Sequence, residues 1–324
     1  MSECVNVTIH ASQFPENVRR DLLASLRTRK VNHKFHYDSF KQTQKWLALH
    51  EAHSPARYDE NCLTTYDQAF AAAAKKIKSK SVHVIGLGCG GGQKDEQLLG
   101  FLKARGKEIF YTPCDVSTAM VLVARQNALK ILPDKNCFPF VCDLATADYL
   151  QKSLVTRHAS LVTFFGMIPN FAPQEILPKL ASLVRPQDWL LFSANLAPGK
   201  NYAAGVKKVL PQYDNLLTHD WLLTFLTDLG VARGDGKLQF RIKDDAANGL
   251  KRIVADFHFA RPVRVNIESE TFEFRAGESI QLFFSYRYTP PRVRKILSRY
   301  GLEVRKEWIS NSGEEGVFLC RQKW

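Results

Sequence analysis

Five apolar runs alternate with helical segments through the middle of the chain. Continuous apolar runs of this length are typical of strands that are buried on both faces of a sheet. Strands that alternate with helices predict a parallel sheet with helices on both faces, which is an α/β fold. The predicted strands are VHVIGL (82–87), IFYTPC (109–114), FPFVCDL (138–144), LVTFFGM (161–167) and DWLLFSANLA (188–197), and the predicted helices cover 93–106, 117–131, 145–155 and 172–184.

The segments around this alternation have a different pattern. A helix at 291–300 and strands at 302–309 and 315–321 end the chain as an antiparallel hairpin. Residues 1–57 are mostly helical, and period-two runs between 198 and 286 predict an antiparallel sheet with one packed face. We therefore expect an α/β domain of 58–197 and 287–324, and an α+β domain of 1–57 and 198–286. The period-two runs are LQFRI, RIVADFHF, VRVNIE, ETFEF and SIQLFFSYRY.

Composition and charge narrow the class of protein. The 324 residues, 45% of them hydrophobic and 24% charged, are those of a folded globular protein of about two domains. The net charge of +13 raises nucleic acid, anionic membranes and acidic small molecules as partners, but the cations are spread along the chain. Even the densest group, Lys75, Lys76, Lys78 and Lys80, is interpreted as a solvated surface.

Other features indicate an intracellular protein. No apolar stretch reaches the ~18 residues that a membrane-spanning helix needs. The N-terminal residues MSECVNVTIHASQF lack the charged and apolar regions of a secretory signal, so we expect a cytoplasmic protein with no membrane partner. The seven cysteines form no CxxC pair, which favours reduced, packed thiols over disulfides or a metal site.

A glycine-rich loop carries the clearest chemistry. Gly86, Gly88 and Gly90 follow a predicted strand and open a helix, where a backbone without side chains can approach a ligand closely. Asp115 and Asp143 end the next two strands, where carboxylates can reach a ribose and an adenine. These residues predict a nucleoside site for either a nicotinamide dinucleotide or S-adenosylmethionine (SAM). A lysine in the first helical turn, Lys94, can neutralise a carboxylate and so favours SAM.

Seven segments, in this order and spacing, make the chain similar to the histidine-specific, SAM-dependent N-methyltransferases that form histidine betaine on the way to ergothioneine. Related fungal enzymes of that family methylate tryptophan or a prenylated tryptophan. The resemblance implies a Rossmann-like class I methyltransferase sheet with a closing antiparallel hairpin, plus a second α+β domain for the substrate. The segments are KFHYDSF (34–40), SPARYDE (54–60), GLGCGGGQKD (86–95), YTPCDVS (111–117), FFGMIPNFAP (164–173), LPQYDN (210–215) and AGESIQLFFSYRY (276–288).

The resemblance assigns roles residue by residue. Asn170 would hold the α-amine and α-carboxylate of an amino acid, Tyr213 the carboxylate, and Tyr37 would lie near the amine. These three would be the catalytic residues, because catalysis here is alignment of the amine with the methyl donor. Ser285 would lie at the side-chain end of the substrate pocket. The residues assigned to SAM, and to its product S-adenosylhomocysteine (SAH), are Gly86, Gly88, Gly90, Lys94, Asp115, Asp143, Leu144 and Gly166.

Three substrate positions depart from the family pattern. The glutamate that holds the imidazole falls on Phe283, the methionine that packs on the imidazole falls on Ala255, and a tyrosine falls on His53 or Ser54. Replacing the carboxylate removes a charge-assisted hydrogen bond worth about 1.5–3 kcal/mol. We therefore expect an α-amino acid with a bulky apolar or aromatic side chain, tryptophan-like first. Histidine is the alternative substrate, and a SAM-binding protein without activity is the alternative from another class.

The remaining expectations follow from absent signals. Nucleic-acid amino-methyltransferases usually have an Asn/Asp-Pro-Pro-aromatic loop after the fourth strand, whereas this chain has GMIPNF there. We therefore expect a small-molecule substrate and no nucleic-acid partner. The histidines have no metal-ligand spacing, so no metal site is expected, and the chain is expected to be a monomer.

Overall fold

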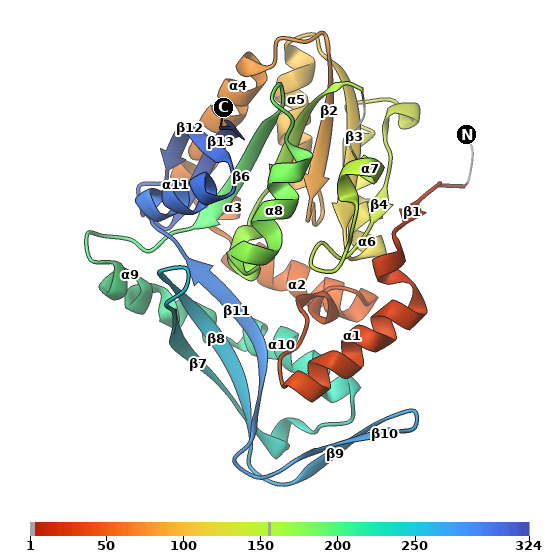
Figure 1. The fold of residues 1–324 in the computed structure, drawn as a ribbon, viewed down its shortest axis with the longest axis vertical. Coiled ribbons are helices and arrows are strands. Elements are labelled where there is room, and N and C mark those ends of the chain that lie inside the picture. The colour runs from red at the N-terminus through yellow and green to blue at the C-terminus, as the bar shows by residue number, and fades with distance from the viewer. Residues whose placement is uncertain (1–3, 155–156, 324) are drawn as a thin grey trace. The chain divides into compact units, whose positions relative to one another are not determined.

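The computed structural model describes residues 4–154 and 157–323. Contacts divide the chain into two units (Figure 1). The first unit contains Met1–Gln13, Tyr58–Leu196 and Tyr288–Trp324, and the second contains Phe14–Arg57 and Ala197–Arg287. The segment up to Gln13, which the sequence grouped with the helical residues after it, lies with the α/β unit because strand β1 (Thr8–Ile9) pairs in parallel with a strand of its sheet.

An eight-stranded sheet forms the centre of the first unit. Its strand order is β1-β4-β3-β2-β5-β6-β13-β12. The strands from β1 to β6 pair in parallel, whereas β13 is antiparallel to both β6 and β12. This arrangement confirms the predicted parallel sheet with a closing antiparallel hairpin. The strands are β2 (Ser81–Leu87), β3 (Glu108–Asp115), β4 (Phe140–Val141), β5 (Ala159–Phe164), β6 (Trp189–Asn195), β12 (Leu302–Ile309) and β13 (Glu315–Gln322).

Helices connect these strands across the sheet. The strand order runs one way from β2 to β4 and the other way from β5 onward, so right-handed connections place the two sets of helices on opposite faces. Helices α5 and α6 belong to one set and α7 and α8 to the other (Figure 1). The helices of this unit are α4 (Glu60–Lys76), α5 (Gln93–Ala104), α6 (Thr118–Ala128), α7 (Leu150–Leu154), α8 (Pro173–Leu183) and α11 (Pro290–Arg299).

Strand β4 and helix α7 are both shorter than the sequence suggests. The predicted strand at 138–144 is reduced to β4, and the predicted helix at 145–155 begins only at Leu150. The physical reason is Asp143, whose carboxylate accepts hydrogen bonds from the Ala145 N–H (2.9 Å) and the Thr146 hydroxyl (3.0 Å). Such local bonds favour a turn over a strand or helix.

The second unit combines helices with two small antiparallel sheets. One sheet has the order β11-β8-β7, and the other is the hairpin of β9 and β10 (Figure 1). Its core includes Leu26, Trp221 and Phe257, each at most 3% exposed. The elements are α1 (Pro15–Thr28), α2 (Phe40–His53), α9 (Tyr202–Val209), α10 (Leu216–Asp228), β7 (Gly236–Asp245), β8 (Leu250–Phe259), β9 (Val263–Ile267), β10 (Glu270–Phe274) and β11 (Ser279–Arg287), and the short helix α3 (Pro55–Tyr58) follows α2.

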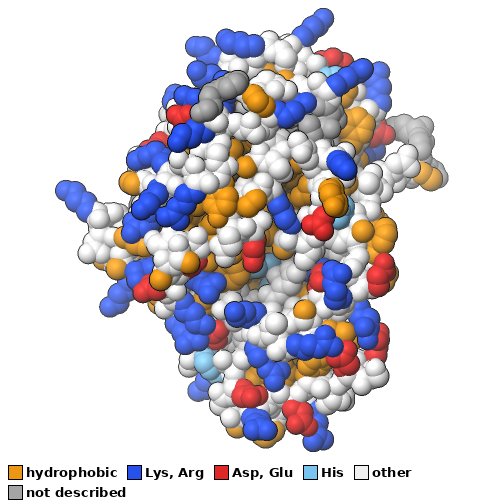
Figure 2. Space-filling view, in the orientation of Figure 1, with side chains coloured by type: hydrophobic (Ala, Val, Ile, Leu, Met, Phe, Trp, Pro, Cys, Tyr) orange, Lys and Arg blue, Asp and Glu red, His pale blue; other side chains and the backbone are white. Residues whose placement is uncertain are grey.

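Surface charge and helix length bear on possible partners. On the face that Figure 2 shows, Lys and Arg side chains are scattered, with Asp and Glu side chains between them. Within the described ranges, no helix is both long and apolar enough to cross a membrane.

Candidate functional site

The glycine loop connects the end of β2 to the first turn of α5. Gly88 (φ 60°) and Gly92 (φ 75°) both have left-handed backbone conformations that favour glycine. A Cβ atom on Gly88 would lie 2.5 Å from the Met167 side chain, and one on Gly92 would lie 2.7 Å from the Ala124 backbone. Glycine is therefore required here by both backbone conformation and close packing.

Asp115, at the end of β3, holds the glycine loop in place. Its carboxylate accepts hydrogen bonds from the Gly90 N–H (2.9 Å) and the Ser117 N–H (3.0 Å). Burial raises the pKa of this carboxyl group, and the bonds from these backbone N–H groups oppose that rise. A carboxylate oxygen accepts more than one hydrogen bond, so Asp115 also has acceptor capacity for the hydroxyls of a ribose.

Asp143 and Leu144 lie in a tightly bonded turn at the end of β4. The Asp143 N–H donates to the Ser12 hydroxyl (3.0 Å), and the Lys179 ammonium donates to the carbonyls of Leu144, Ala145 and Ala147 at 2.7–2.9 Å. Sequence reasoning missed Lys179, because these contacts join residues that are more than 30 positions apart. Both predicted residues are buried, and contact with an adenine remains a prediction for them.

Lys94, in the first turn of α5, is part of a polar chain. Its ammonium donates to the Tyr66 hydroxyl (2.7 Å) and lies 4.3 Å from the centroid of the Tyr66 ring. The Tyr66 hydroxyl in turn donates to the Glu315 carboxylate. Tyr66 lies on α4 and Glu315 on β13, so neither was evident from the glycine-loop motif. These contacts hold a cation beside the loop, at the place where the sequence predicts a carboxylate of the cofactor.

Gly166 and Asn170 follow β5. The Gly166 N–H donates to the Ser193 hydroxyl (2.8 Å), and a Cβ atom on Gly166 (φ 70°) would have no atom within 4 Å. Gly166 is exposed, so its left-handed backbone conformation, and not crowding, favours glycine there. Asn170 ends a 3-10 turn, where its N–H donates to the carbonyl of Met167, the residue that packs against Gly88. The structure thus brings Gly166 and Asn170 to the same edge of the sheet as the glycine loop.

In the second unit, Tyr213 and Ser285 are directly bonded. The Tyr213 hydroxyl donates to the Ser285 hydroxyl (2.9 Å), and the Arg287 guanidinium donates to the Tyr213 hydroxyl (2.8 Å). Arg287 is only 6% exposed, and its guanidinium carbon lies 5.3 Å from the centroid of the Tyr213 ring. Sequence reasoning missed Arg287, although it is two residues after Ser285 in the same strand, β11.

Phe283 lies in an aromatic cluster of the second unit. Its ring centroid is 5.7 Å from that of Trp221 and 6.3 Å from that of Tyr213. The Tyr37 ring is 5.4 Å from Trp221, which links Tyr37 to the same cluster. In the sheet register, Phe283 on β11 is paired with Ala255 on β8. The structure therefore brings together five predicted residues of the second unit, namely Tyr37, Tyr213, Ala255, Phe283 and Ser285.

Two histidines of the second unit differ in how they relate to the aromatic cluster around Phe283. His53 is exposed at the end of α2, and no hydrogen bond or ring contact in the described ranges joins its side chain to the aromatic cluster. His33 was not predicted, yet its ring centroid lies 5.4 Å from that of Phe283. Both ring nitrogens of His33 are buried without a hydrogen-bond partner among the described residues. Burial, and to a smaller extent the neighbouring His36, lowers the pKa of His33 to about 3, so its ring is neutral at physiological pH.

The sheet order, the glycine loop and the bonded carboxylate at the end of β3 are those of the class I, SAM-dependent methyltransferase fold. The positive-φ glycines of the loop and the cation of Lys94 fit SAM as the methyl donor. The model of the family "Histidine-specific methyltransferase, SAM-dependent" matches residues 18–322, and the chain belongs to this family. SAM is the cofactor of that family.

Individual relatives are distant. The N-methyltransferase fsqC of Aspergillus fumigatus is 23% identical over 240 residues, which are 72% of this chain, and the chain spans 64% of that curated relative. Magnesium protoporphyrin IX methyltransferase (ChlM) from Synechocystis PCC 6803, solved with bound SAH, has a TM-score of 0.46 and 12% identity, over 89% of this chain and 97% of that one. The glycopeptide N-methyltransferase MtfA, solved with SAM, has a TM-score of 0.40 and 13% identity, over 79% and 93% of the two chains.

Proposed function

We propose that this protein transfers a methyl group from SAM to the α-amine of a free amino acid with a bulky apolar or aromatic side chain, tryptophan-like first. The observation that supports this most directly is the pairing of Phe283 with Ala255 across β11 and β8. By resemblance, these are the positions at which the family has the glutamate and the methionine that contact an imidazole. Both substitutions relative to the family pattern therefore alter adjacent positions on the same sheet.

The surroundings of Phe283 support an aromatic side chain in the substrate. Phe283 is 7% exposed, with the rings of Trp221 and Tyr213 beside it. Offset and edge-to-face ring pairs contribute about 0.5–1.5 kcal/mol beyond the burial of apolar area. An imidazole N–H that lost the family's carboxylate acceptor would cost about 1–3 kcal/mol if it stayed buried and unpaired.

His33 supports an aromatic side chain that carries an N–H group. A neutral imidazole has one nitrogen that accepts a hydrogen bond and one that donates. Since both His33 nitrogens are buried without partners among the described residues, an indole N–H from the substrate would relieve one of them. A site that pairs a polar group discriminates strongly against analogues that lack it, so tryptophan is favoured over phenylalanine and leucine.

Arg287 and Tyr213 suit the carboxylate of an amino acid. A buried guanidinium that already donates to Tyr213 places positive charge beside the hydroxyl that the resemblance assigns to that carboxylate. In the same proposal Asn170 and Tyr37 hold the amine in its neutral, nucleophilic form. SAM, when bound, supplies an electrophilic methyl group. The protein contributes orientation of the amine and exclusion of water.

Substrate choice tests the proposal. We would titrate the protein, saturated with SAH, with histidine, tryptophan, tyrosine, phenylalanine and leucine by calorimetry, and then assay methyl transfer from SAM to each amino acid that binds. We expect tryptophan to bind most tightly and to be methylated on its α-amine. Preferred binding of histidine would show that the protein is instead a histidine N-methyltransferase. SAH binding without methylation of any tested or related amino acid would instead favour a SAM-binding protein without activity.

A further inference from the structure

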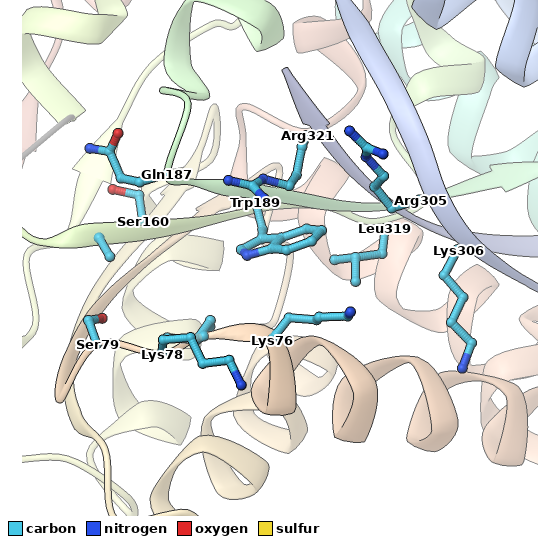
Figure 3. Close-up of a pocket in the computed structure, with 12 residues that line it drawn as sticks. Lys76, Lys78, Ser79, Ser160, Gln187, Trp189, Arg305, Lys306, Leu319 and Arg321 are labelled. Carbon is cyan, nitrogen blue, oxygen red and sulfur yellow. The ribbon is translucent and has the colours of Figure 1, made fainter. Parts of the chain in front are cut away.

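A cavity of about 820 Å³ lies at the opposite edge of the first unit's sheet from the glycine loop. It is lined where β2, β5 and β6 begin and where α4 ends, together with residues of β12 and β13 (Figure 3). The seven residues of β2 separate this edge from the glycine loop by about 20 Å, at about 3.3 Å per residue. The cavity is therefore not part of the cofactor site.

Positive charge dominates the side chains around this cavity. Five of the twelve lining residues are cations, and the lining contains neither Asp nor Glu. Within the described ranges, the ammonium groups of Lys76 and Lys78 have no ion-pair or hydrogen-bond partner, although both are exposed. The C-terminus of α4 accounts for Lys76, since helix ends favour Lys there. Arg305 pairs with Glu303 outside the lining (2.9 Å), and these two explanations leave three cations. The cationic lining residues are Lys76, Lys78, Arg305, Lys306 and Arg321.

The remaining lining is mostly apolar. Ile77, Ala159, Trp189 and Leu319 contribute apolar side chains. Figure 3 shows the Trp189 indole between the Arg321 side chain and the side chains of Lys76 and Lys78. The Arg321 guanidinium lies 4.8 Å from the centroid of an indole ring of Trp189, and one of its terminal nitrogens donates to the Pro186 carbonyl (2.6 Å). Its Nε atom is buried without an acceptor among the described residues.

We propose that this cavity binds an aromatic organic anion. Its ring system would lie against Trp189 and Ile77, and its carboxylate or phosphate would lie near Lys76, Lys78 and Arg321. The volume is that of pockets for single small molecules, about 300–1,000 Å³. A small ligand is favoured over a nucleic acid because Lys and Arg side chains on the face that Figure 2 shows are interspersed with Asp and Glu side chains rather than gathered in one patch. This second site is independent of the proposed substrate.

Two pairs of probes separate the parts of this proposal. We would titrate the SAH-saturated protein with 2-naphthoate and with AMP, and with their uncharged counterparts 2-naphthamide and adenosine. SAH keeps the adenine-bearing probes away from the cofactor site. We expect one of the anions to bind at least tenfold more tightly than its uncharged counterpart, and the affinity to fall as salt is added. The stronger anion identifies the head group as carboxylate or phosphate.

Variants test the location. The double variant K76Q/K78Q should weaken binding of that anion at least tenfold, whereas K80Q, which removes an exposed cation outside the lining, should leave it within twofold. The NMR signal of the Trp189 indole N–H, assigned with W189F, should shift on binding. Unchanged SAH affinity in the variants shows that they are folded. Equal binding of charged and uncharged probes, equal effects of K80Q and K76Q/K78Q, or no binding of either anion would overturn the proposal.

Discussion

Restoring the family's residues at the paired positions Phe283 and Ala255 should shift the amino-acid preference toward histidine. In F283E/A255M, a carboxylate replaces a ring that is 7% exposed, and a longer side chain fills part of the volume that the ring leaves. A charge-assisted bond from an imidazole to the new carboxylate contributes about 1.5–3 kcal/mol. Tryptophan loses ring contacts worth about 0.5–1.5 kcal/mol. Together these terms change the ratio of histidine to tryptophan affinity by about 30- to 2,000-fold, at 1.36 kcal/mol per factor of ten.

Calorimetric titration of the SAH-saturated double variant measures this ratio. A matched control is F40E, which makes the same change at an exposed phenylalanine of the second unit, the first residue of α2. Phe40 is 69% exposed, and no ring contact in the described ranges joins it to the aromatic cluster of Phe283. We expect F40E to leave the ratio within threefold. F283Q separates hydrogen bonding from charge, because its amide accepts a bond without carrying charge.

Two results would refute the reasoning about Phe283. The first is a wild-type protein that already prefers histidine to tryptophan. The second is a folded double variant, shown by unchanged SAH affinity, in which the ratio does not move. A variant that fails to fold is replaced by F283Q alone, whose amide still offers an acceptor. The ratio for F283Q should then rise by about 5- to 160-fold, from a neutral hydrogen bond of about 0.5–1.5 kcal/mol and the loss of ring contacts of about 0.5–1.5 kcal/mol to tryptophan.

Three further expectations concern the cofactor loop, the carboxylate and pH. D115A should weaken SAH binding by about 10- to 150-fold in calorimetry, since it removes charged bonds of about 1.5–3 kcal/mol. The control D134A changes an exposed aspartate and should leave SAH affinity unchanged. Equal SAH affinities of D115A and the wild type would contradict the role of Asp115. R287M should raise the KM for the amino acid about tenfold or more without changing SAH affinity, and R287K should have a KM between those of R287M and the wild type. An unchanged KM in R287M would show that Arg287 does not bind the substrate. Burial, and to a smaller extent the neighbouring His158, lowers the pKa of His83 to about 4. Because the unfolded chain takes up this proton near pH 6.5, stability present above that pH is lost as the pH falls toward 4, by about 1 kcal/mol between pH 7.5 and 5.5. In urea unfolding, the free energy of unfolding of H83N should fall less between pH 7.5 and 5.5 than that of the wild type. An equal fall in both proteins would contradict this role of His83.

The central strands and the glycine loop were predictable because they depend on local pattern. Buried strands are continuous apolar runs, and the residues at their carboxyl ends share one edge of a parallel sheet, so Asp115 could be placed at that edge in advance, whereas Gly166 was assigned by the family resemblance. Strand β1 was missed because two residues show no periodicity, and its pairing with Phe140–Val141 is decided by a distant segment. The turn after β4 was missed because Asp143 was considered for a ligand rather than for its own backbone.

The residues missed around the site have a common physical cause. The contacts of Lys94 with Tyr66, of Arg287 with Tyr213 and of His33 with Phe283 each join side chains from different elements. Periodicity and motif spacing report how a segment folds, and they do not report which segments meet. Such contacts could be found only once the sheets and helices had been placed.

The pairing of Phe283 with Ala255 shows why a family assignment leaves the substrate open. The two residues are 28 positions apart, and each departure alone could be ordinary drift in a core. The register of β11 against β8 makes them neighbours, so the loss of a carboxylate and the loss of a long side chain alter the same surface. The glycine loop and Asp115 keep the family pattern in the first unit, where the methyl donor is expected. Membership of the family is therefore compatible with a different side chain in the amino acid, and the affinity ratio of F283E/A255M tests that difference directly.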